Sequence, residues 1–470
     1  MKFNLRPYQE QLIRSVFAHW AAGHKRVLMQ SGTGTGKTVM FNHITNLAKN
    51  KGKRVLIIAD RRELIQQAWT KLWEGFGIHS GIILSGTPPA YQLPVQIASI
   101  QTLNKRSFPP DIDMVVIDEC RGSVAPSYNP IFDYYKDCYF LGVDATPIRT
   151  NGKGFDHLYD KIVIGPSIKE MEAAGALVPA KSYINPVNQQ ALSKLRLTAG
   201  DYNEKDLARM MMDGSLTADM VASKTKWAPG FPTLAFAVNI EHSKAIVDRY
   251  RSAGIKAEHV DGSFSIADRE RIFRDFKTGK IELLSNVGIA TYGFDMPEIL
   301  AVQLARPTKS LSLFLQMVGR GTRPNQDKAH YVLLDHANCI FEHGQPNADR
   351  NWTLYGSEVK KKKTPKQFKD KRTGQLITPD TVLPEYLDGA ELEELRPEEL
   401  QFIQACKQID GIIEKQQRNG YKPMWVYFQY VEKNPSPELN EFAYMGKRLG
   451  FNPRWAHFKH EQHSQKAQEA

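Results

Sequence analysis

The glycine-rich run SGTGTGKT at residues 31–38 constrains the fold of this chain more than any other segment. It follows the apolar segment RVLMQ and precedes the amphipathic segment VMFNHITNLAKN, which is the strand, loop and helix order that a phosphate-binding loop requires. Glycines let the backbone curl until N–H groups and a helix N-terminus face the phosphates of a nucleotide. We expect the whole run to line an ATP site: Ser31, Gly32, Thr33, Gly34, Thr35, Gly36, Lys37 and Thr38.

Two side chains of this loop are expected to act on the phosphates and on the metal ion. Lys37 is expected to neutralise the β- and γ-phosphates, and the hydroxyl of Thr38 is expected to ligate Mg²⁺. The general pattern begins with glycine, whereas Ser31 stands at that position here. A glycine-rich turn that binds nothing is disfavoured because strand, loop, Gly-Lys-Thr and helix all agree.

Two adjacent carboxylates, Asp118 and Glu119, follow the apolar run MVVI. They would stand at the carboxyl edge of a parallel sheet, where ligands of such sheets gather. We expect Asp118 to hold Mg²⁺, directly or through water, and Glu119 to orient and deprotonate the attacking water. Acidic pairs are common on surfaces, so this signal gains its strength from the apolar run before it and from the phosphate-binding loop.

The segment QMVGRGTR at 316–323 is expected to supply the other half of the site. Two arginines three residues apart would lie one helical turn apart and point the same way. Guanidinium groups suit the negative charge that spreads over the γ-phosphoryl oxygens during transfer. If Gln316, Arg320 and Arg323 act from the opposite domain, hydrolysis requires a closed cleft and drives domain motion. An interdomain salt-bridge pair is the alternative.

Short runs rich in Val, Ile and Leu occur in two separate series between amphipathic stretches. Such runs are typical of buried parallel strands in an α/β sheet. We therefore predict two α/β domains, at 1–165 and 226–350, joined at 166–225 by a helical connecting segment without a clear strand. The expected strands are 26–30, 54–59, 95–99, 114–119 and 139–145 in the first domain, and 233–237, 281–286, 301–305 and 329–335 in the second.

The remaining chain is predicted to form a charged linker at 351–400 and a small, mainly helical module at 401–470. Residues 360–372 carry eight basic side chains and one acid, and residues 385–399 carry seven acids and one arginine. Such blocks are typical of solvated linkers, and contact between the basic half and phosphate is the alternative. The module holds a two-copy repeat, GYKPMWVYF at 420–428 and GFNPRWAHF at 450–458, and each Gly-aromatic-x-Pro is expected to begin a helix. Its aromatic residues either form a small core, which we favour, or stack on bases beside basic residues.

The composition of the chain limits its expected partners, its cysteine chemistry and its cellular location. A formal charge of +11 favours a polyanionic partner, although solubility alone would also explain it. The four cysteines are far apart and form no C-x-x-C pair, so neither a disulfide framework nor a zinc site is indicated. No stretch approaches the roughly 18 apolar residues that span a bilayer, and the N-terminus lacks an apolar signal region. We expect a cytoplasmic protein with no membrane partner.

In this order, the motifs resemble the superfamily 2 DEAD/DEAH-box helicases, and more closely bacterial and bacteriophage members similar to RadD-type enzymes. The resemblance covers residues 5 to about 345 and implies two RecA-like P-loop domains that use ATP and Mg²⁺ to move along nucleic acid. LRPYQ (5–9) looks like the adenine-recognition motif, whereas ADRRELIQQ (59–67), ASIQTL (98–103) and NVGIATYGFDMP (286–297) look like strand-contacting or ATP-sensing motifs. The implied contacts are the adenine for Arg6 and Gln9, the nucleic-acid backbone for Arg62, Gln101, Thr102 and Thr291, and the nucleotide for Gly293 and Asp295.

Two positions depart from the family pattern. The family usually has histidine where Arg121 stands, and threonine or serine where Asp144 stands; in relatives these positions help to couple the nucleotide site to the strand-binding surface. Asp144 and Thr146 belong to the segment DATP, which sits where the coupling motif should be. Because the two substitutions introduce opposite charges, we hypothesise that Arg121 and Asp144 form a salt bridge in place of a neutral hydrogen bond. Two unrelated changes, or a degraded motor, are the alternatives.

Together these motifs predict an ATP-dependent DNA helicase or translocase, that is, a nucleic-acid-stimulated ATPase. Its expected partners are single-stranded or branched DNA, and partner proteins at the C-terminal module. An RNA helicase would satisfy the same motifs, because such motors hold mainly the phosphate backbone. A nucleic-acid-binding protein with weak ATPase is the interpretation from another class; the charges at Arg121 and Asp144 motivate it, and the presence of Lys37, Glu119 and Arg323 disfavours it. We find no nuclease signature.

Overall fold

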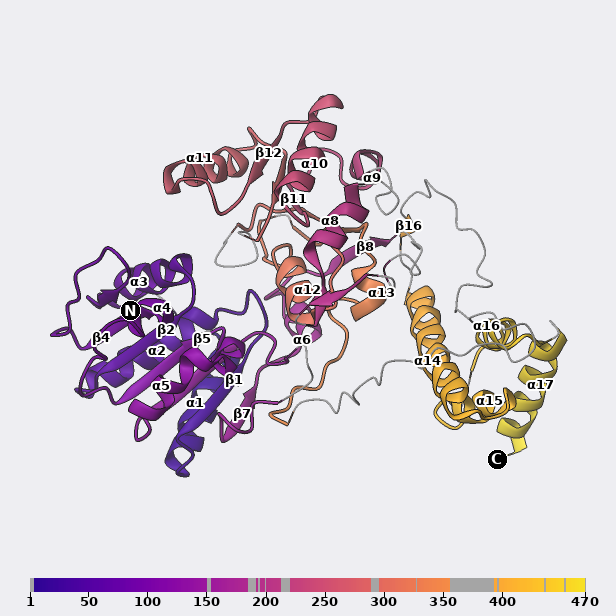
Figure 1. The fold of residues 1–470 in the computed structure, drawn as a ribbon, viewed down its shortest axis with the longest axis horizontal. Helices are drawn as coiled ribbons and strands as arrows, with labels where there is room; N and C mark the ends of the chain where they lie inside the picture. The colour runs from indigo at the N-terminus through magenta and orange to yellow at the C-terminus, as the bar shows by residue number, and fades with distance from the viewer. Residues whose placement is uncertain are drawn as a thin grey trace. The chain divides into compact units, whose positions relative to one another are not determined.

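The computed structural model describes residues 4–149, 154–184, 192, 195–198, 200–212, 220–288, 296–326, 328–355, 393–394, 397–434, 437–451 and 454–469. The chain divides into a large unit, Met1–Cys339 with Gln345–Leu392, and a C-terminal unit, Ile340–Gly344 with Glu393–Ala470. The large unit contains two parallel sheets with flanking helices, which we call the first and second lobes (Figure 1). This confirms the predicted α/β class with a helical C-terminal region.

The first lobe is a parallel sheet in the order β3-β4-β2-β5-β6-β1-β7. Its central strands are buried along their whole length, which explains their continuous apolar runs. The strands are β1 (Arg26–Gln30), β2 (Val55–Ala59), β3 (Gly81–Ile83), β4 (Val95–Ser99), β5 (Met114–Asp118), β6 (Tyr139–Asp144) and β7 (Lys161–Ile164); the helices are α1 (Pro7–Ala21), α2 (Lys37–Asn50), α3 (Arg62–Phe76), α4 (Ile100–Leu103) and α5 (Asn129–Tyr134).

The second lobe has its own parallel sheet, in which β12, β13, β11, β14, β15 and β8 are neighbours in that order. Its strands are β8 (Ala180–Ile184), β11 (Thr233–Phe236), β12 (Ala257–Val260), β13 (Leu283–Asn286), β14 (Ala301–Leu304) and β15 (Tyr331–Asp335). Its helices are α8 (Glu204–Met212), α9 (Met220–Trp227), α10 (Ile240–Ser252), α11 (Ile266–Lys277) and α12 (Leu311–Val318). Helix α13 (Cys339–His343) follows β15 in the chain and, from Ile340 on, is part of the C-terminal unit.

All nine predicted strands lie within observed strands or overrun them by one or two residues. The strands β3, β7 and β12 were not predicted, because β3 has only three residues, β7 (KIVI) is exposed at both ends, and β12 (AEHV) has two polar residues in its middle.

The prediction of a purely helical connecting segment at 166–225 is wrong. After α6 (Ile168–Ala173), strand β8 pairs in parallel with β15 and so belongs to the second sheet. A short antiparallel pair, β9 (Leu197–Thr198) and β10 (Asp201–Tyr202), then precedes α8. Strand β8, with the sequence AKSYI, lacks a continuous apolar run, which is why sequence periodicity missed it.

Residues 345–355 form a strap that the sequence prediction divided between the second domain and the charged linker. At one end, Ser182 in β8 donates a hydrogen bond to Gln345 Oε1 at 2.9 Å. At the other end, the side chain of Leu354 is buried in the core of the first lobe, and its carbonyl accepts from Phe155 N at 2.6 Å. The strap therefore links the two lobes a second time, and residues 351–355 belong to the large unit rather than to a linker.

The C-terminal unit is built from α14 (Pro397–Asn419), α15 (Met424–Val431), α16 (Leu439–Leu449) and α17 (Arg454–Glu469), with the short strand β16 (Glu393–Glu394) before them. Both helices that were expected to begin after Gly-aromatic-x-Pro do so, α15 at Met424 and α17 at Arg454. Within the described part of the chain, no helix has both the length and the apolar character to cross a bilayer. Most of the predicted linker, residues 356–392 and 395–396, lies outside the described residues.

Candidate functional site

The glycine-rich loop joins β1 to α2, as predicted, and braces itself through its own hydroxyl groups. Gly34 and Gly36 have φ of 83° and 84°, a left-handed conformation that glycine adopts without a steric cost. The hydroxyl of Ser31 lies 2.6 Å from that of Thr35, which donates to the carbonyl of Gly32 at 2.7 Å. Serine at the first position therefore contributes a brace that glycine would not. Lys37 Nζ lies 3.5 Å from the same carbonyl of Gly32.

The N-terminal motif lies directly against this loop. Gln9 Nε2 donates to the carbonyl of Thr35 at 2.9 Å, and Tyr8 Oη donates to the same oxygen at 2.7 Å. Gln9 Oε1 in turn accepts from the backbone N–H of Arg6 at 2.9 Å. The residues expected to read adenine are thus tied to the phosphate loop, although their contact with a base stays a prediction.

Asp118 ends β5, and Glu119 follows in a left-handed conformation with φ of 51°. Such a conformation costs a residue with a side chain about 1–2 kcal/mol, so the turn is held by its surroundings. Burial, and then the carboxylate of Glu119, raise the pKa of Asp118 to about 7, against the lowering effect of Lys37. A nearby cation would favour the charged form of a buried carboxylate with so high a pKa, which agrees with the expected Mg²⁺.

The hypothesis of an ion pair between Arg121 and Asp144 is confirmed. Arg121 Nη1 lies 2.9 Å from Asp144 Oδ1, and the backbone N–H of Arg121 donates to Asp144 Oδ2 at 2.8 Å. Asp144 is fully buried, and its Oδ1 also accepts from the backbone N–H of Thr146 at 2.8 Å. The same guanidinium forms an ion pair with Glu119, a contact that sequence reasoning did not foresee. Arg121 therefore joins the expected catalytic base to the expected coupling segment.

The second lobe reaches this cluster through Gln316. Its Nε2 lies 3.4 Å from Glu119 Oε2, and with the amide turned over its oxygen would accept from Arg121 Nη1 at 3.2 Å. The prediction that Arg320 and Arg323 lie one helical turn apart is wrong, because α12 ends at Val318. Glycine at 319 and 321 disfavours helix, and Pro324 disfavours helical geometry at the residue before it.

The turn at 319–323, which we call the arginine turn, packs on the phosphate loop. A Cβ added to Gly319 would lie 2.7 Å from Thr33 Cγ2, so only glycine allows this approach. A Cβ added to Gly34 would lie 3.9 Å from Arg323 Cγ. Both glycines are easy to find in the sequence, but only the structure shows that they face residues of the other lobe. Loop and arginine turn are therefore adjacent, as a shared site requires.

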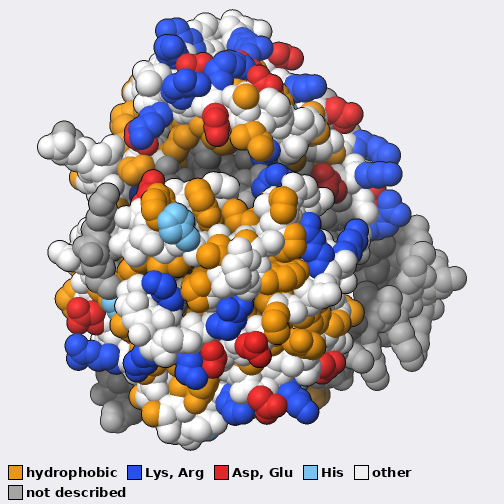
Figure 2. Space-filling view, turned by 90° about the vertical axis from the view of Figure 1, so that its left-hand side faces the viewer, with side chains coloured by type: hydrophobic (Ala, Val, Ile, Leu, Met, Phe, Trp, Pro, Cys, Tyr) orange, Lys and Arg blue, Asp and Glu red, His pale blue; other side chains and the backbone are white. Residues whose placement is uncertain are grey.

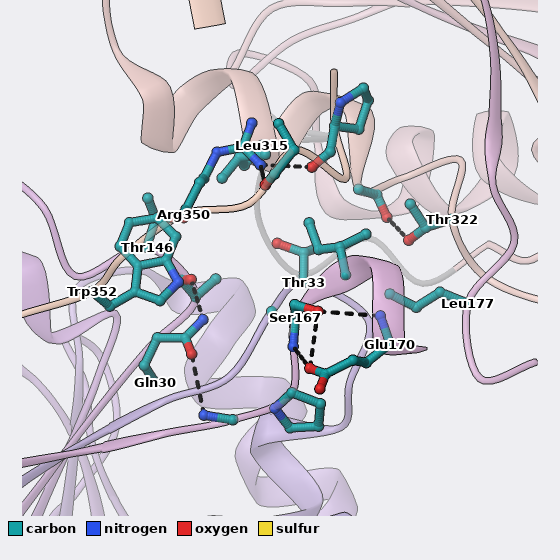
Figure 3. Close-up of a pocket in the computed structure, with 18 of the residues that line it drawn as sticks. Gln30, Thr33, Thr146, Ser167, Glu170, Leu177, Leu315, Thr322, Arg350 and Trp352 are labelled. Carbon is teal, nitrogen blue, oxygen red and sulfur yellow. Dashed lines mark hydrogen bonds between the residues drawn. The ribbon is translucent and has the colours of Figure 1, made fainter. Parts of the chain in front are cut away.

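A cavity of about 220 Å³ lies beside the loop. Its walls come from both lobes and the strap, and Figure 3 shows residues that line it. Its lining includes Thr33 and Thr146 from the first lobe, Leu315 and Thr322 from the second, and Arg350 and Trp352 from the strap. Lys37, Asp118, Glu119 and the two arginines of the arginine turn do not line it. We therefore do not assign the triphosphate to this cavity.

The residues expected to touch a nucleic-acid strand follow neighbouring strands of the first sheet. Arg62 begins α3 after β2, while Gln101 and Thr102 lie in α4 after β4, so all three share the carboxyl edge with the phosphate loop. Arg62 and Gln101 are exposed. Thr291, Gly293 and Asp295 lie outside the described residues.

Cations are spread over the side of the large unit on which α3 and α11 lie. Figure 2 views this side and shows Lys and Arg side chains gathered over its upper part. Helix α11 presents Arg271, Arg274 and Lys277, of which Arg271 pairs with Asp275 at 3.7 Å and Lys277 with Glu298 at 3.4 Å. This surface suits a polyanion, but its contacts with a strand stay a prediction.

Two family models match the chain. "Type III restriction enzyme, res subunit" matches residues 2–149, and "Helicase conserved C-terminal domain" matches residues 218–325. These ranges fall on the first and second lobes. The matches end before the strap, and neither covers the C-terminal unit.

Among curated proteins, a 51.5 kDa protein of a Lactococcus phage is 32% identical over 342 residues, which cover 73% of this chain and 72% of the relative. The "Putative ATP-dependent helicase IRC3" of Saccharomyces cerevisiae is 32% identical over 70% of this chain and 51% of the relative. The "DNA 3'-5' helicase XPB" of Kineococcus radiotolerans is 26% identical over 69% of this chain and 58% of the relative. The chain thus spans only about half to three fifths of these two named helicases.

Among solved structures, a fragment named as the HsdR subunit of a type I restriction enzyme from Vibrio vulnificus superposes with a TM-score of 0.57 at 22% identity. The match covers 73% of this chain and 66% of that chain. At this identity the likeness concerns the fold, and it supports the two-lobed architecture.

Proposed function

Since the chain belongs to the superfamily 2 helicases, we propose that it hydrolyses ATP in order to move along DNA or unwind it. One observation carries the proposal: the arginine turn of the second lobe packs on the phosphate loop of the first, while Gln316 contacts Glu119. Two lobes that share one nucleotide can convert hydrolysis into relative motion. The narrower resemblance to RadD-type enzymes stays a prediction, because the relatives above do not test it.

We assign the chemical steps to residues of both lobes. Lys37 and the backbone N–H groups of the loop bind the β- and γ-phosphates, and Glu119 takes a proton from the attacking water. Arg320 and Arg323 stabilise the charge that develops on the γ-phosphoryl oxygens. Mg²⁺, held by Thr38 and Asp118, would supply further positive charge to the phosphates when bound.

Arg121 gives this site a feature of its own. Its guanidinium neutralises Glu119 while it is also paired with Asp144, so the base is held by the coupling segment. While Glu119 Oε2 is engaged by the guanidinium, that oxygen has less capacity left to accept a hydrogen bond from the attacking water. We propose that strand binding, by moving the segment of Asp144 and Thr146, loosens this hold and so raises the rate of hydrolysis.

DNA is the strand that we propose, because the named relatives include a DNA helicase, and because the family model that matches the first lobe is named for a restriction-enzyme subunit. The test is ATP turnover with no nucleic acid and with single-stranded DNA, duplex DNA, branched DNA and RNA, each at saturating concentration. We expect DNA to raise turnover at least about tenfold above the basal rate, which corresponds to about 1.4 kcal/mol in the barrier. Stimulation by RNA alone would make the enzyme an RNA helicase, and no stimulation by any strand would contradict the proposal.

A further inference from the structure

The two-copy repeat of the C-terminal unit is a repeat in space as well as in sequence. Gly420 ends α14 and Gly450 ends α16, with φ of 67° and 73°, so both joints turn in the same left-handed way. After the first glycine, the rings of Tyr421 and Trp425 meet at 4.6 Å and 41°. After the second, the rings of Phe451 and Trp455 meet at 4.7 Å and 40°. The unit therefore consists of two similar helical hairpins.

The core of the unit uses only some of its aromatic residues. Trp425 and Trp455 pack against the buried cluster, together with the buried rings of Tyr427, Tyr430 and Phe442, so the prediction of an aromatic core is confirmed. Phe428 and Phe458, which occupy the same position in the two copies, are 58% and 59% exposed. Because packing does not account for them, these phenylalanines are available for a contact with something outside the unit.

The two stretches of sequence that contain the copies carry basic side chains and no acidic ones, and one of these cations, Arg448, forms an ion pair with Asp410 from outside them at 2.8 Å. The stretch 415–431 contains three Lys or Arg and no acid, and the stretch 445–460 contains four and no acid. Glu414, Glu432 and Glu461 lie just outside these stretches. Lys459 Nζ lies 4.8 Å from the ring of Tyr427 and 5.4 Å from that of Phe458, so its charge sits where the two copies meet. Such a surface attracts a polyanion and repels other cations.

We propose that this aromatic surface, formed by Lys415, Tyr421, Lys422, Phe428, Phe458 and Lys459, is a second binding site for single-stranded DNA that acts without nucleotide. Exposed rings stack on bases of any sequence, and interleaved cations neutralise the backbone. A protein partner would fit the phenylalanines, but it would not by itself account for two acid-free stretches. The inference rests on the proposed function only in naming DNA as the strand. Its consequence is that the chain keeps hold of DNA while the motor is between nucleotides.

The first experiment measures binding of a fluorescent single-stranded oligothymidine to the full chain without nucleotide, by anisotropy. Replacing Phe428 and Phe458 together with leucine keeps apolar area but removes stacking, and we expect Kd to rise about tenfold or more. The matched Phe428→Tyr, Phe458→Tyr variant keeps stacking and should bind within about twofold of the wild type. Tyr355→Leu, which removes an 81% exposed ring from the large unit, should also bind like the wild type.

The second experiment measures the salt dependence of the same binding. Replacing Lys415 and Lys422 with alanine should flatten the slope of log Kd against log salt concentration by about 1.4, because each phosphate contact on a single strand contributes about 0.7. Equal affinity of the leucine variant and the wild type, with both melting at the same temperature, would overturn the inference and leave a protein contact as the explanation of the phenylalanines. If the wild type binds DNA but no strand stimulates its ATPase, the proposed function fails and this inference survives.

Discussion

The two lobes of the large unit hold their buried polar side chains, near the carboxyl ends of the strands, in different ways. In the first lobe, a single guanidinium, that of Arg121, holds the carboxylates of both Glu119 and the fully buried Asp144. In the second lobe, a chain of buried hydrogen bonds links Ser285 to Ser243 at 2.6 Å, Ser243 to His259 at 2.7 Å and His259 to Asp261 at 2.8 Å.

From this difference we infer that the charged cluster of the first lobe affects catalysis, whereas the hydrogen-bonded chain of the second lobe affects stability alone. The charged cluster touches the group that we assign as the base, so a change there alters both catalysis and stability. The hydrogen-bonded chain ends at Asp261, which fixes the turn at Ser263 through bonds of 2.7 and 2.6 Å to its N–H and hydroxyl. A change there should affect stability first. The four predictions below test this division, from the largest expected effect to the smallest.

The largest effect is expected from removing one cation on either side of the shared site. Lys37→Ala and Arg323→Ala should each lower strand-stimulated turnover about 10³-fold, the magnitude seen when a transition-state arginine is lost. They should differ in binding, because Lys37 contacts the ground-state phosphates whereas Arg323 acts on the transition state. Turnover and the affinity for a non-hydrolysable ATP analogue are the measurements. Arg249→Ala, which removes an exposed cation of the second lobe, is the control. Unchanged turnover of Arg323→Ala would mean that the lobes do not share one site.

The next effect concerns the charged cluster itself. Arg121→Ala leaves the fully buried Asp144 without its counter-charge, and we expect it to lower the free energy of unfolding by about 3 kcal/mol. Arg121→His combined with Asp144→Thr restores the neutral pair usual in the family and should recover much of this loss. Urea unfolding and ATP turnover of Arg121→His, of Asp144→Thr and of the variant that carries both substitutions form a cycle. Additive losses would show that the two residues are not coupled.

The same cluster shows how far sequence alone could lead. The loop, the acid pair and the opposite charges of Arg121 and Asp144 were readable, because each consists of a residue type at a fixed spacing. The third contact of Arg121, with Glu119, was not readable, since it depends on the left-handed turn at Glu119. The strap was missed because Leu354 is a single apolar residue beside a charged stretch, and only tertiary packing gives it a place in the first lobe. Strand β8 was missed for a similar reason, because its sequence AKSYI has no continuous apolar run and only its pairing with β15 makes it a strand of the sheet.

A smaller loss of turnover is expected when a methyl group is added at the contact between the lobes and no chemical group is removed. A Cβ at position 319 would lie 2.7 Å from Thr33 Cγ2 and 2.8 Å from the carbonyl of Leu315, so the arginine turn must move away from the loop. Displacement of catalytic groups by about 1 Å costs on the order of 10²-fold in rate, so we expect Gly319→Ala to lose between about tenfold and 10²-fold in stimulated turnover.

Gly321→Ala is the matched control for this crowding. Its Cβ would clash with the ring of Tyr331 inside the second lobe, so it should lower the melting temperature instead. Adding Thr33→Ala to Gly319→Ala removes the facing methyl group and should restore part of the rate. If Gly319→Ala turned over ATP at the wild-type rate, the arginine turn would not need to approach the loop as closely as we propose.

The smallest effect is expected in the second lobe's hydrogen-bonded chain. Ser243→Ala removes the bonds to Ser285 and His259 and leaves buried polar atoms without them, which should lower the free energy of unfolding by about 1–3 kcal/mol. Replacing Ser285 with alanine as well should add little, because removing both partners of a buried bond is nearly neutral. Basal turnover should stay at the wild-type level, since none of these groups contacts the loop or the acids. If basal turnover fell further than the fraction of unfolded protein explains, the buried hydrogen bonds of the second lobe would also affect the reacting groups. The assignment of catalysis to the first lobe's cluster and of stability to the second lobe's chain would then be wrong.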